Sequence, residues 1–592
     1  MKKQLLLLVM ILLPMVVSAD DSGSCGENVT YTFNETTKTL TISGNGKMDW
    51  FRIENGWGNN DKDTPWKPYQ EEILHVVIES NVTSIGEGSF WGCSNLKTVT
   101  IPSTVVECRN SSFKDCNNLE AVYITSLEAW CNIDFEMNGV SSNPLYYAHN
   151  LYLNGEKIVN LVVPEGISEI KTCTFCGFNE MTSLIIPNSV ETIGPSAFAH
   201  CNGLSSLTVP NSVTEIKAYA FENCEGLTSI QLFDNLEKIG SFAFGYCTAL
   251  FSIVIPNSVT TLGDSSFAGC SGLSYVTLSN SLKSVGGFSD CTSLTTIDIP
   301  EGVETIYGGA FMRCTNLTSI KMPSTIKTVD MNAFSNCYKL KQIHIADIGK
   351  WCQISYSSWS DASLPFAASY GGHLYLNNEE IIDLEIPDGV TSISANAFRY
   401  CIGINSVKMP QSVNKIGEQA FANCSNLEDV EISDNLQKLE NKTFYGCKIK
   451  KVTIPSSVQY IYSQVFDACY SLESVRVKAE TPPFLNPTAF SNYNIPLYVP
   501  AESVDAYKAA EPWKNFGVIQ EIVEGYVKGD VDGDGEVNEV DAQQILDVSV
   551  GILSVNDLAV PEAINVPGGN PSALEVNAQL VLDYSVATVK PW

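Results

Sequence analysis

Residues 207–226 read LTVPNSVTEIKAYAFENCEG, and residues 253–272 read IVIPNSVTTLGDSSFAGCSG. Both belong to one phrase that recurs from Ile73 to about Asn494, usually at a spacing of twenty-three residues, with the consensus L-x-x-V-x-I-P-x-S-V-x-x-I-G-x-x-A-F-x-x-C-x-x. A fixed period of this length is typical of a repeat architecture in which each copy is one structural unit. The copies begin at Ile73, Leu96, Leu119, Ile158, Met181, Leu204, Leu227, Leu250, Leu273, Leu294, Leu317, Leu340, Ile381, Ile404, Leu427, Ile449 and Leu472.

Each copy predicts one turn of a coil. Apolar residues at phrase positions 4 and 6 alternate with mostly polar ones at positions 3 and 5, which is the period of a strand with one buried face. The proline at position 7 ends that strand because it has no N–H to donate. The Ala-Phe pair and the cysteine at position 21 close the coil from the opposite wall. One coil buries too little to fold alone, so the copies must stack. We therefore expect a β-rich solenoid of right-handed coils with short strands, turns and short helices.

Thirteen of the nineteen cysteines stand at phrase position 21 or its equivalent, so their spacing is the repeat spacing. Nucleophilic, zinc and disulfide chemistry all need particular partners, whereas a cysteine in every coil needs only a small buried slot. We expect a structural column of free thiols. Cys173 and Cys176 form a separate C-x-x-C, which is either a local packing variant or a redox pair. The thirteen are Cys93, Cys116, Cys201, Cys224, Cys247, Cys270, Cys291, Cys314, Cys337, Cys401, Cys424, Cys447 and Cys469.

The start of the chain predicts export. Lys2 and Lys3 precede an apolar run and the small-residue site Val17-Ser18-Ala19, so residues 1–19 are expected to be a signal peptide. A lipoprotein signal is the alternative, but Cys25 follows a polar stretch. With a net charge of −31 and no later apolar stretch long enough for a membrane span, we expect neither nucleic-acid binding nor membrane insertion. The expected product is a monomer that is secreted, extracellular or held at the cell surface.

The repeated phrase resembles the BspA-like leucine-rich-repeat family of secreted bacterial proteins. The resemblance implies an N-terminal cap over residues 20–72, leucine-rich repeats over 73–494 and a C-terminal cap over 495–522. It also implies an adhesin-like function without catalysis, in which the solenoid binds a host, microbial or matrix protein. The five histidines agree with this expectation, since none lies in a zinc motif or beside a nucleophile.

Two inserts, at about residues 123–157 and 344–380, interrupt the period and resemble each other through a Trp-Cys pair and a closing LYLN segment. We expect hairpin-like insertions that project from the solenoid. Their aromatic residues are candidates for partner contacts, and the alternative is that they pack each insert onto its coil. The candidates are Trp130, Phe135, Tyr146, Tyr147, Trp351, Tyr356, Trp359 and Tyr370.

The outward strand positions are a second candidate surface. In the middle of the array they are rich in hydroxyl groups, which suit a protein or glycan partner but also suit a plain soluble sheet. Toward the C-terminus they become charged, with Asp383, Glu385, Asp429 and Glu431 followed by Lys450 and Lys451. These changes of sign favour a protein partner with matching charged patches. The hydroxyl residues are Ser183, Ser206, Thr208, Ser229, Ser252, Thr277, Thr296 and Ser319.

After a linker at residues 523–528, residues 529–592 predict a small all-α calcium-binding domain. The segment GDVDGDGEVNEVDAQQIL delivers carboxylates at loop positions 1, 3, 5 and 12, with a glycine at position 6 that permits the turn. Calcium is a hard cation that takes six to eight oxygen ligands, and this spacing supplies them from one loop. We predict one calcium ion, with Glu536 acting through its carbonyl. The predicted ligands are Asp530, Asp532, Asp534, Glu536, Asn538 and Asp541.

This segment resembles a type I dockerin. Residues 575–586 repeat residues 539–550 at an offset of thirty-six, but no carboxylate stands at the equivalent ligand positions of the second half. The resemblance implies a cohesin partner and, as an alternative function, an accessory part of a cellulosome-like, polysaccharide-degrading complex. A structural or surface-tethering role for the module is the other alternative.

Overall fold

The computed structural model describes residues 21–51, 62–136, 139–356 and 371–522. The predicted signal peptide, linker and calcium module therefore lie outside the described residues. The described chain divides into two units. The larger runs to Glu473 and adds 483–493, and the smaller contains 474–482 and the residues from Asn494 onward.

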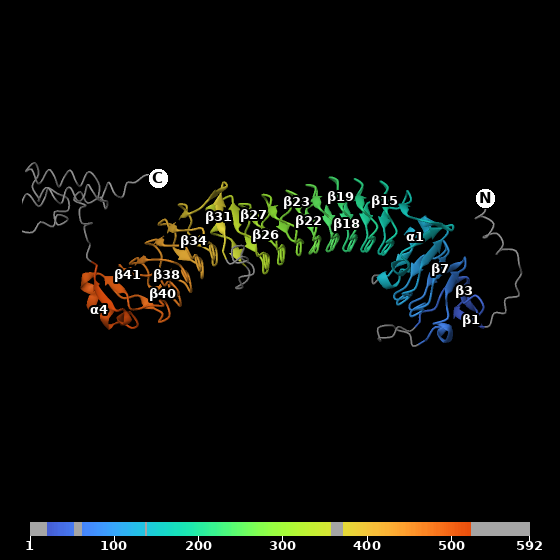
Figure 1. The fold of residues 1–592 in the computed structure, drawn as a ribbon, viewed down its shortest axis with the longest axis horizontal. Helices are drawn as coiled ribbons and strands as arrows, with labels where there is room; N and C mark the ends of the chain where they lie inside the picture. Colours follow the sequence, from blue (N-terminus) through green and yellow to red (C-terminus); the bar gives the residue numbers. More distant parts are fainter. Residues whose placement is uncertain (1–20, 52–61, 137–138, 357–370, 523–592) are drawn as a thin grey trace, which may run out of the picture. The chain divides into compact units, whose positions relative to one another are not determined.

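In the larger unit the repeats form stacked coils that follow one another in chain order (Figure 1). In each regular coil the first strand lies within phrase positions 3 to 6, where apolar residues alternate with mostly polar ones. The strands of this first row are β5 (His75–Ile78), β7 (Thr98–Ile101), β9 (Ala121–Ile124), β11 (Leu151–Leu153), β13 (Asn160–Val162), β15 (Ser183–Ile185), β17 (Ser206–Thr208), β19 (Ser229–Gln231), β21 (Ser252–Val254), β23 (Tyr275–Thr277), β25 (Thr296–Asp298), β27 (Ser319–Met322), β29 (Gln342–Ile345), β31 (His373–Leu376), β33 (Asp383–Glu385), β35 (Ser406–Lys408), β37 (Asp429–Glu431) and β39 (Lys451–Ile454).

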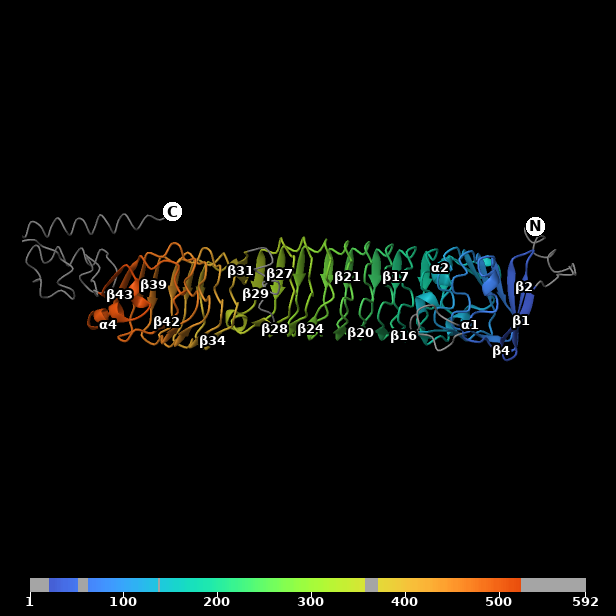
Figure 2. The same cartoon turned by 90° about the horizontal axis from the view of Figure 1, so that it is seen from below.

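A second, shorter strand lies across the coil from the first, and Figure 2 shows the two rows on opposite walls. The repeated phrase predicted that the Ala-Phe pair and the cysteine close the coil from the opposite wall, but it did not predict a second strand. The second row comprises β6 (Val82–Ile85), β8 (Glu107–Cys108), β10 (Asp134–Phe135), β14 (Glu169–Ile170), β16 (Thr192–Ile193), β18 (Glu215–Ile216), β20 (Lys238–Ile239), β22 (Thr261–Leu262), β24 (Ser284–Val285), β26 (Thr305–Ile306), β28 (Thr328–Val329), β30 (Ser355–Tyr356), β34 (Ser392–Ile393), β36 (Lys415–Ile416), β38 (Lys438–Leu439), β40 (Tyr460–Ile461) and β42 (Phe484–Leu485).

Parallel pairing between successive coils holds both rows in register. Ser206, Leu207 and Thr208 on β17 face Ser229, Ile230 and Gln231 on β19, an offset of one repeat. The same offset joins the second-row strands β16, β18, β20 and β22. Equivalent phrase positions therefore form straight columns along the stack.

The core contains a column of aromatic rings from phrase position 18. Phe175, Phe198, Phe221 and Phe244 stack with centroid separations of 5.2–5.4 Å, and each side chain is fully buried. The column continues through Phe267, Phe288, Phe311 and Phe334, and a similar one runs from Phe398 to Phe490.

The predicted cysteine column lies beside these rings. The Cys224 thiol donates to the Phe198 carbonyl at 3.2 Å, and Cys247 repeats this bond to Phe221 at 3.3 Å. The bond joins position 21 of one coil to position 18 of the preceding coil. All nineteen cysteines are buried free thiols. A small weak donor thus satisfies one buried carbonyl in each such coil.

Three tryptophans lie next to the phenylalanine column. One is at the start of the array, and the other two are where the regular period is interrupted. The indole N–H of Trp66 donates to the Ser89 carbonyl at 3.0 Å, immediately before Phe90. Trp130 and Trp351 donate to the carbonyls just before Phe175 and Phe398, at 3.0 and 2.9 Å. All three indoles are almost completely buried.

The described N-terminal strands cover the first coil. β1 (Asp21–Gly26), β2 (Val29–Asn34) and β3 (Thr39–Gly44) form an antiparallel meander, and β3 then pairs in parallel with β5. β4 (Gly46–Lys47) pairs with β6 in the second row. The short helix η1 (Lys67–Tyr69) follows Trp66.

The smaller unit has its own compact interior. β43 (Pro496–Val499) pairs in parallel with β41 (Ser474–Val477) and β44 (Val518–Glu521). The helix α4 (Val504–Ala509) carries the buried Tyr507, whose hydroxyl donates to the Ala479 carbonyl at 2.9 Å. The short helices η5 (Ala501–Ser503) and η6 (Trp513–Asn515) complete the described part.

The ring column predicts a large cost for removing one ring. Phe221→Ala should lower the free energy of unfolding by about 3–5 kcal/mol, because it leaves a cavity between Phe198 and Phe244. Urea denaturation followed by circular dichroism measures the change. Tyr338→Ala is the control, since Tyr338 is 57% exposed and its loss should leave the free energy nearly unchanged. Equal effects of the two substitutions would contradict the role of the column.

Candidate binding surfaces

The acidic residues predicted on the outer strand face come together on β33 and β37, which both pair with the strand between them, β35. β33, β35 and β37 align Asp383 with Ser406 and Asp429, and Glu385 with Lys408 and Glu431. The four acidic side chains are exposed. The Ser406 hydroxyl donates to Asp383 at 2.5 Å, and Lys408 lies 3.8 Å from Glu431. The four carboxylates outnumber the one lysine, so this patch has an excess of negative charge. We call it the acidic patch.

The hydroxyl residues in the middle of the first row also face outward, since seven of the eight are exposed and Ser319 is half-buried. The structure adds apolar side chains that the sequence analysis did not single out. Ile185, Phe251, Val254 and Tyr275 are between 55% and 64% exposed. Ile185 and Val254 stand at phrase position 5, so their outward orientation could have been read from the period.

Each insert ends in an antiparallel hairpin, as expected, formed by β11 with β12 (Glu156–Lys157) and by β31 with β32 (Glu379–Glu380). The other described strands of the inserts differ from the expected projection. In the first insert β10 pairs with β8 and β11 pairs with β9, so these strands continue the two rows of the solenoid. In the second, β30 pairs with β28 and β31 pairs with β29. Short helices, α1 (Leu127–Asn132), α2 (Leu145–Ala148) and α3 (Ile348–Trp351), fill the longer coils. The prediction of projection is wrong for these segments because their backbone groups complete the ladders.

The insert aromatics are accordingly divided between the core and the surface. Trp130, Phe135 and Trp351 are buried, so the packing alternative holds for them and they are not contact residues. Tyr146, Tyr147 and Tyr356 are half-buried. Tyr146 lies edge-on to Tyr147 and to His200, at 5.2 and 5.6 Å. Trp359 and Tyr370 lie outside the described residues.

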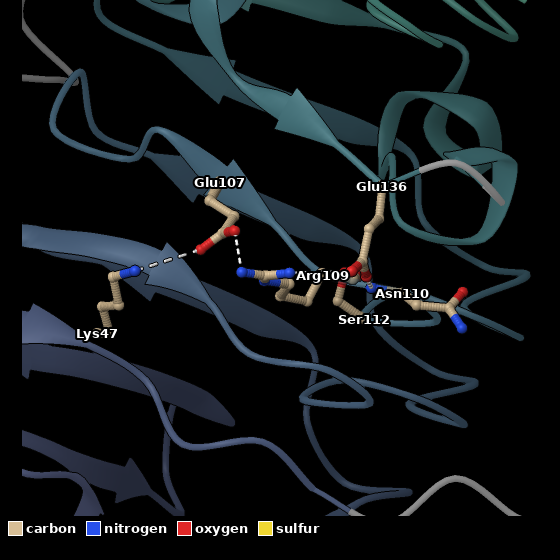
Figure 3. Close-up of polar contacts among 6 residues, drawn as sticks. All are labelled: Lys47, Glu107, Arg109, Asn110, Ser112 and Glu136. Atoms are coloured by element: carbon tan, nitrogen blue, oxygen red, sulfur yellow. Dashed lines mark hydrogen bonds and ion pairs between the residues drawn. The ribbon is translucent and has the colours of Figure 1, made fainter. Parts of the chain in front are cut away.

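A network of ion pairs and hydrogen bonds connects the first insert to the preceding coil (Figure 3). Arg109 forms ion pairs with Glu107 and with Glu136, the latter at 2.9 Å. The other carboxylate oxygen of Glu136 accepts from the backbone N–H of Asn110 at 2.7 Å. The Trp50 ring lies 5.2 Å from the guanidinium. Glu107, Arg109 and Glu136 are half-buried, and the Arg109 Nε has no hydrogen-bond partner among the described residues. No motif in the sequence indicated this cluster.

The repeat model of the BspA-type leucine-rich repeat region matches residues 69–139, 148–270, 237–365 and 368–496. The chain belongs to the BspA-type leucine-rich repeat family. These matches cover most of the coils, which are the same units that the structure stacks. No curated protein sequence matches the chain.

Several solved structures resemble this BspA-type protein. A leucine-rich repeat protein from Bacteroides ovatus is 23% identical with a TM-score of 0.41, and the match covers 76% of this chain and 94% of that one. One from Eubacterium ventriosum is 23% identical with a TM-score of 0.40, over 54% and 90% of the two chains. A leucine-rich cell surface protein from Faecalibacterium prausnitzii is 22% identical with a TM-score of 0.24, over 84% and 97%. The family assignment depends on the repeat model and not on these scores.

The predicted calcium ligands of the BspA-type chain lie outside the described residues. Within the described ranges, no group of three or more histidine, cysteine or acidic side chains is arranged to hold a metal ion. None of the helices in those ranges combines the length and the apolar character that crossing a membrane requires.

Burial controls the chemistry of the thiols. It raises the pKa of Cys224, Cys337 and Cys401 to about 12. Cys173 and Cys176 are also buried and hydrogen-bonded to each other. This bond lowers the pKa of Cys173, while the bond together with burial raises the pKa of Cys176. A thiol with a raised pKa stays protonated at neutral pH and reacts slowly.

The thiols predict a test of the packed interior. At pH 8 the cysteine column should react with Ellman's reagent only slowly in the folded protein and completely in guanidinium chloride, because unfolding exposes the thiols and returns raised pKa values such as that of Cys224 toward 9.0. A column thiol such as that of Cys224 has a higher pKa in the folded protein than in the unfolded one. Protection of the thiols from the reagent is therefore complete below about pH 9 and is lost as the pH rises toward 12. Absorbance at 412 nm measures the rate. Ser229→Cys supplies an exposed thiol that should react quickly, and equally fast native reaction of the column would contradict the burial.

Proposed function

We propose that this protein is a non-catalytic binding protein of the cell exterior, in which the solenoid holds a protein partner through the acidic patch. The supporting observation is the alignment of four exposed carboxylates on β33 and β37, whose pairing with the strand between them, β35, fixes their spacing. The solenoid holds this surface in place before a partner binds. Binding therefore costs little conformational entropy in the solenoid.

The partner favoured by this patch is a protein with a basic surface, from a host, a microbe or the extracellular matrix. Opposite charges raise the association rate and disfavour partners with the same charge. The net charge of −31 over the whole chain adds a long-range attraction for such a partner. Export through residues 1–19 brings the chain to the compartment in which the partner occurs.

Neutralising the acidic patch should weaken binding. A variant with Asp383→Asn, Glu385→Gln, Asp429→Asn and Glu431→Gln should bind immobilised collagen, laminin or fibrinogen at least about tenfold more weakly than the natural chain, and high salt should have a similar effect. Surface plasmon resonance measures the association and dissociation rates.

A matched control neutralises the same number of exposed glutamates on other segments, with Glu35→Gln, Glu156→Gln, Glu165→Gln and Glu225→Gln. The control separates a local patch from a general effect of net charge. Equal weakening by both variants, or binding to none of the three matrix proteins, would overturn the proposed partner surface.

The predicted calcium module carries the second part of the proposal. Residues 530–541 supply an oxygen-rich loop, with Asp530, Asp532, Asp534 and Asp541 as carboxylate ligands, Glu536 through its carbonyl and Asn538 as a further ligand. One bound calcium ion would organise the loop and the helix predicted to follow it. The dockerin resemblance of this segment favours the second candidate function, an accessory component recruited by a cohesin to a polysaccharide-degrading complex.

Calcium titration tests this module. Isothermal titration calorimetry of the full chain should find one calcium ion per molecule, and Asp532→Ala should abolish that binding because it removes a charged ligand. Asn570→Ala, in the predicted second half, should leave the stoichiometry unchanged. Two ions, or no binding by the natural chain, would contradict the prediction.

The same variants separate the two candidate functions. If the module docks, the natural chain binds an immobilised type I cohesin in calcium, and both EDTA and Asp532→Ala prevent capture. Capture by a chain that ends at residue 528 would eliminate the docking function. Absence of capture in calcium would leave the protein-binding solenoid as the supported function.

A further inference from the structure

A groove opens on the outer face of the first row at β23, β25 and β27. Its cavity volume is about 500 Å³, which lies within the usual range of ~300–1,000 Å³ for small-molecule sites. Tyr275 and Thr277 line it from β23, Asp298 lines it from β25, and Lys321 lines it from β27. Glu301 contributes from the turn that follows β25. The groove lies away from the three strands of the acidic patch.

An irregular coil accounts for the position of the groove. The copies that begin at Leu273 and Leu294 are only twenty-one residues apart, and Ser279 replaces the usual proline at phrase position 7. β23 is the last strand of the sheet β17-β19-β21-β23, while β25 begins the sheet β25-β27-β29-β31-β32. The row of first strands is therefore divided at this point. Val276, which faces the interior on β23, is half-buried, whereas its equivalents Ile253 and Ile297 are buried.

An aromatic side chain forms one wall of the groove. Tyr275 stands at phrase position 3, where the preceding strands β17, β19 and β21 carry serine, and it is 63% exposed. The Phe251 ring supports it edge-on, with centroids 5.2 Å apart and planes inclined by 65°. An exposed ring held by a second ring keeps its orientation without a large loss of side-chain freedom on binding.

Groups of both charges stand opposite this wall. Asp298 and Lys321 are register partners on β25 and β27, and both are exposed. Among the described residues, neither side chain forms an ion pair or a side-chain hydrogen bond. The Glu301 carboxylate is oriented by Ser324, whose backbone N–H and hydroxyl donate to its two oxygens at 3.1 and 3.2 Å. The groove thus presents acceptors at Asp298 and Glu301 and a donor at Lys321.

We propose that this groove binds a neutral oligosaccharide. Sugar hydroxyls both donate and accept, so one ring can donate to the carboxylates and accept from the lysine. The polarised C–H face of a sugar ring packs against the negative face of an aromatic ring such as Tyr275. A strongly charged ligand of either sign would meet a like charge in the groove, which disfavours it.

This inference does not depend on the protein partner proposed above. It assigns a different ligand class to a different set of strands, so either proposal can fail while the other holds. A chain with both sites would hold a protein and a glycan on the outer face of the first row of strands.

The test measures binding of the full chain to defined probes by isothermal titration calorimetry. The probes are the neutral tetrasaccharides of cellulose, xylan, mannan, galactan and chitin, with tetragalacturonate as an anionic comparison. At least one neutral probe should bind. Tyr275→Ala and Asp298→Ala should each weaken that binding by about tenfold or more, because each removes a contact made in the groove.

Two further variants show whether the groove itself is the site. Thr296→Trp should block binding by filling the cavity while leaving Tyr275 and Asp298 in place. Tyr470→Ala removes a tyrosine that is 87% exposed elsewhere and should bind as the natural chain does. Circular dichroism melting confirms that each variant is folded. The proposal is overturned if no neutral probe binds, if tetragalacturonate binds more tightly, or if Tyr275→Ala binds as the natural chain does.

Discussion

Each coil of this protein completes its interior only against the next coil, chiefly through the column of phenylalanine rings and the thiols beside it. The ring of Phe221 is buried because Phe198 and Phe244 cover its two faces. The carbonyl of Phe198 is satisfied because Cys224 of the following coil reaches it. Because both contacts join one coil to the next, a coil is stable only within the array and not alone.

The same constraint explains how the irregular segments are accommodated. Where the twenty-three-residue period is interrupted, Trp130 and Trp351 donate to the carbonyls that precede the next ring of the column. Trp66 does the same at the start of the array. A tryptophan fills a larger space than a phenylalanine and brings its own donor, so it can close a longer coil without leaving a polar group unsatisfied. The inserts are thereby held within the stack.

Regular stacking also prepares the outer face for binding. Because the strands pair at an offset of one repeat, any side chain at phrase position 3 or 5 stands beside its equivalent on the next strand. Substitutions at these positions do not disturb the interior, so the face can vary while the stack stays the same. The acidic patch on β33, β35 and β37 and the groove at β23 and β25 are two results of this freedom, one from regular coils and the other from a shortened coil.

The sequence alone determined the repeat, the buried and outward positions of each strand and the column of cysteines, because these follow from a period that every copy repeats. It also placed Asp383, Glu385, Asp429 and Glu431 on one face, since strand alternation is local. It could not decide whether Trp130 and Trp351 reach a partner, because that depends on which carbonyl lies one coil away. The second row of strands and the groove beside Tyr275 were likewise decided only by the tertiary structure, since both arise from how one coil rests on another.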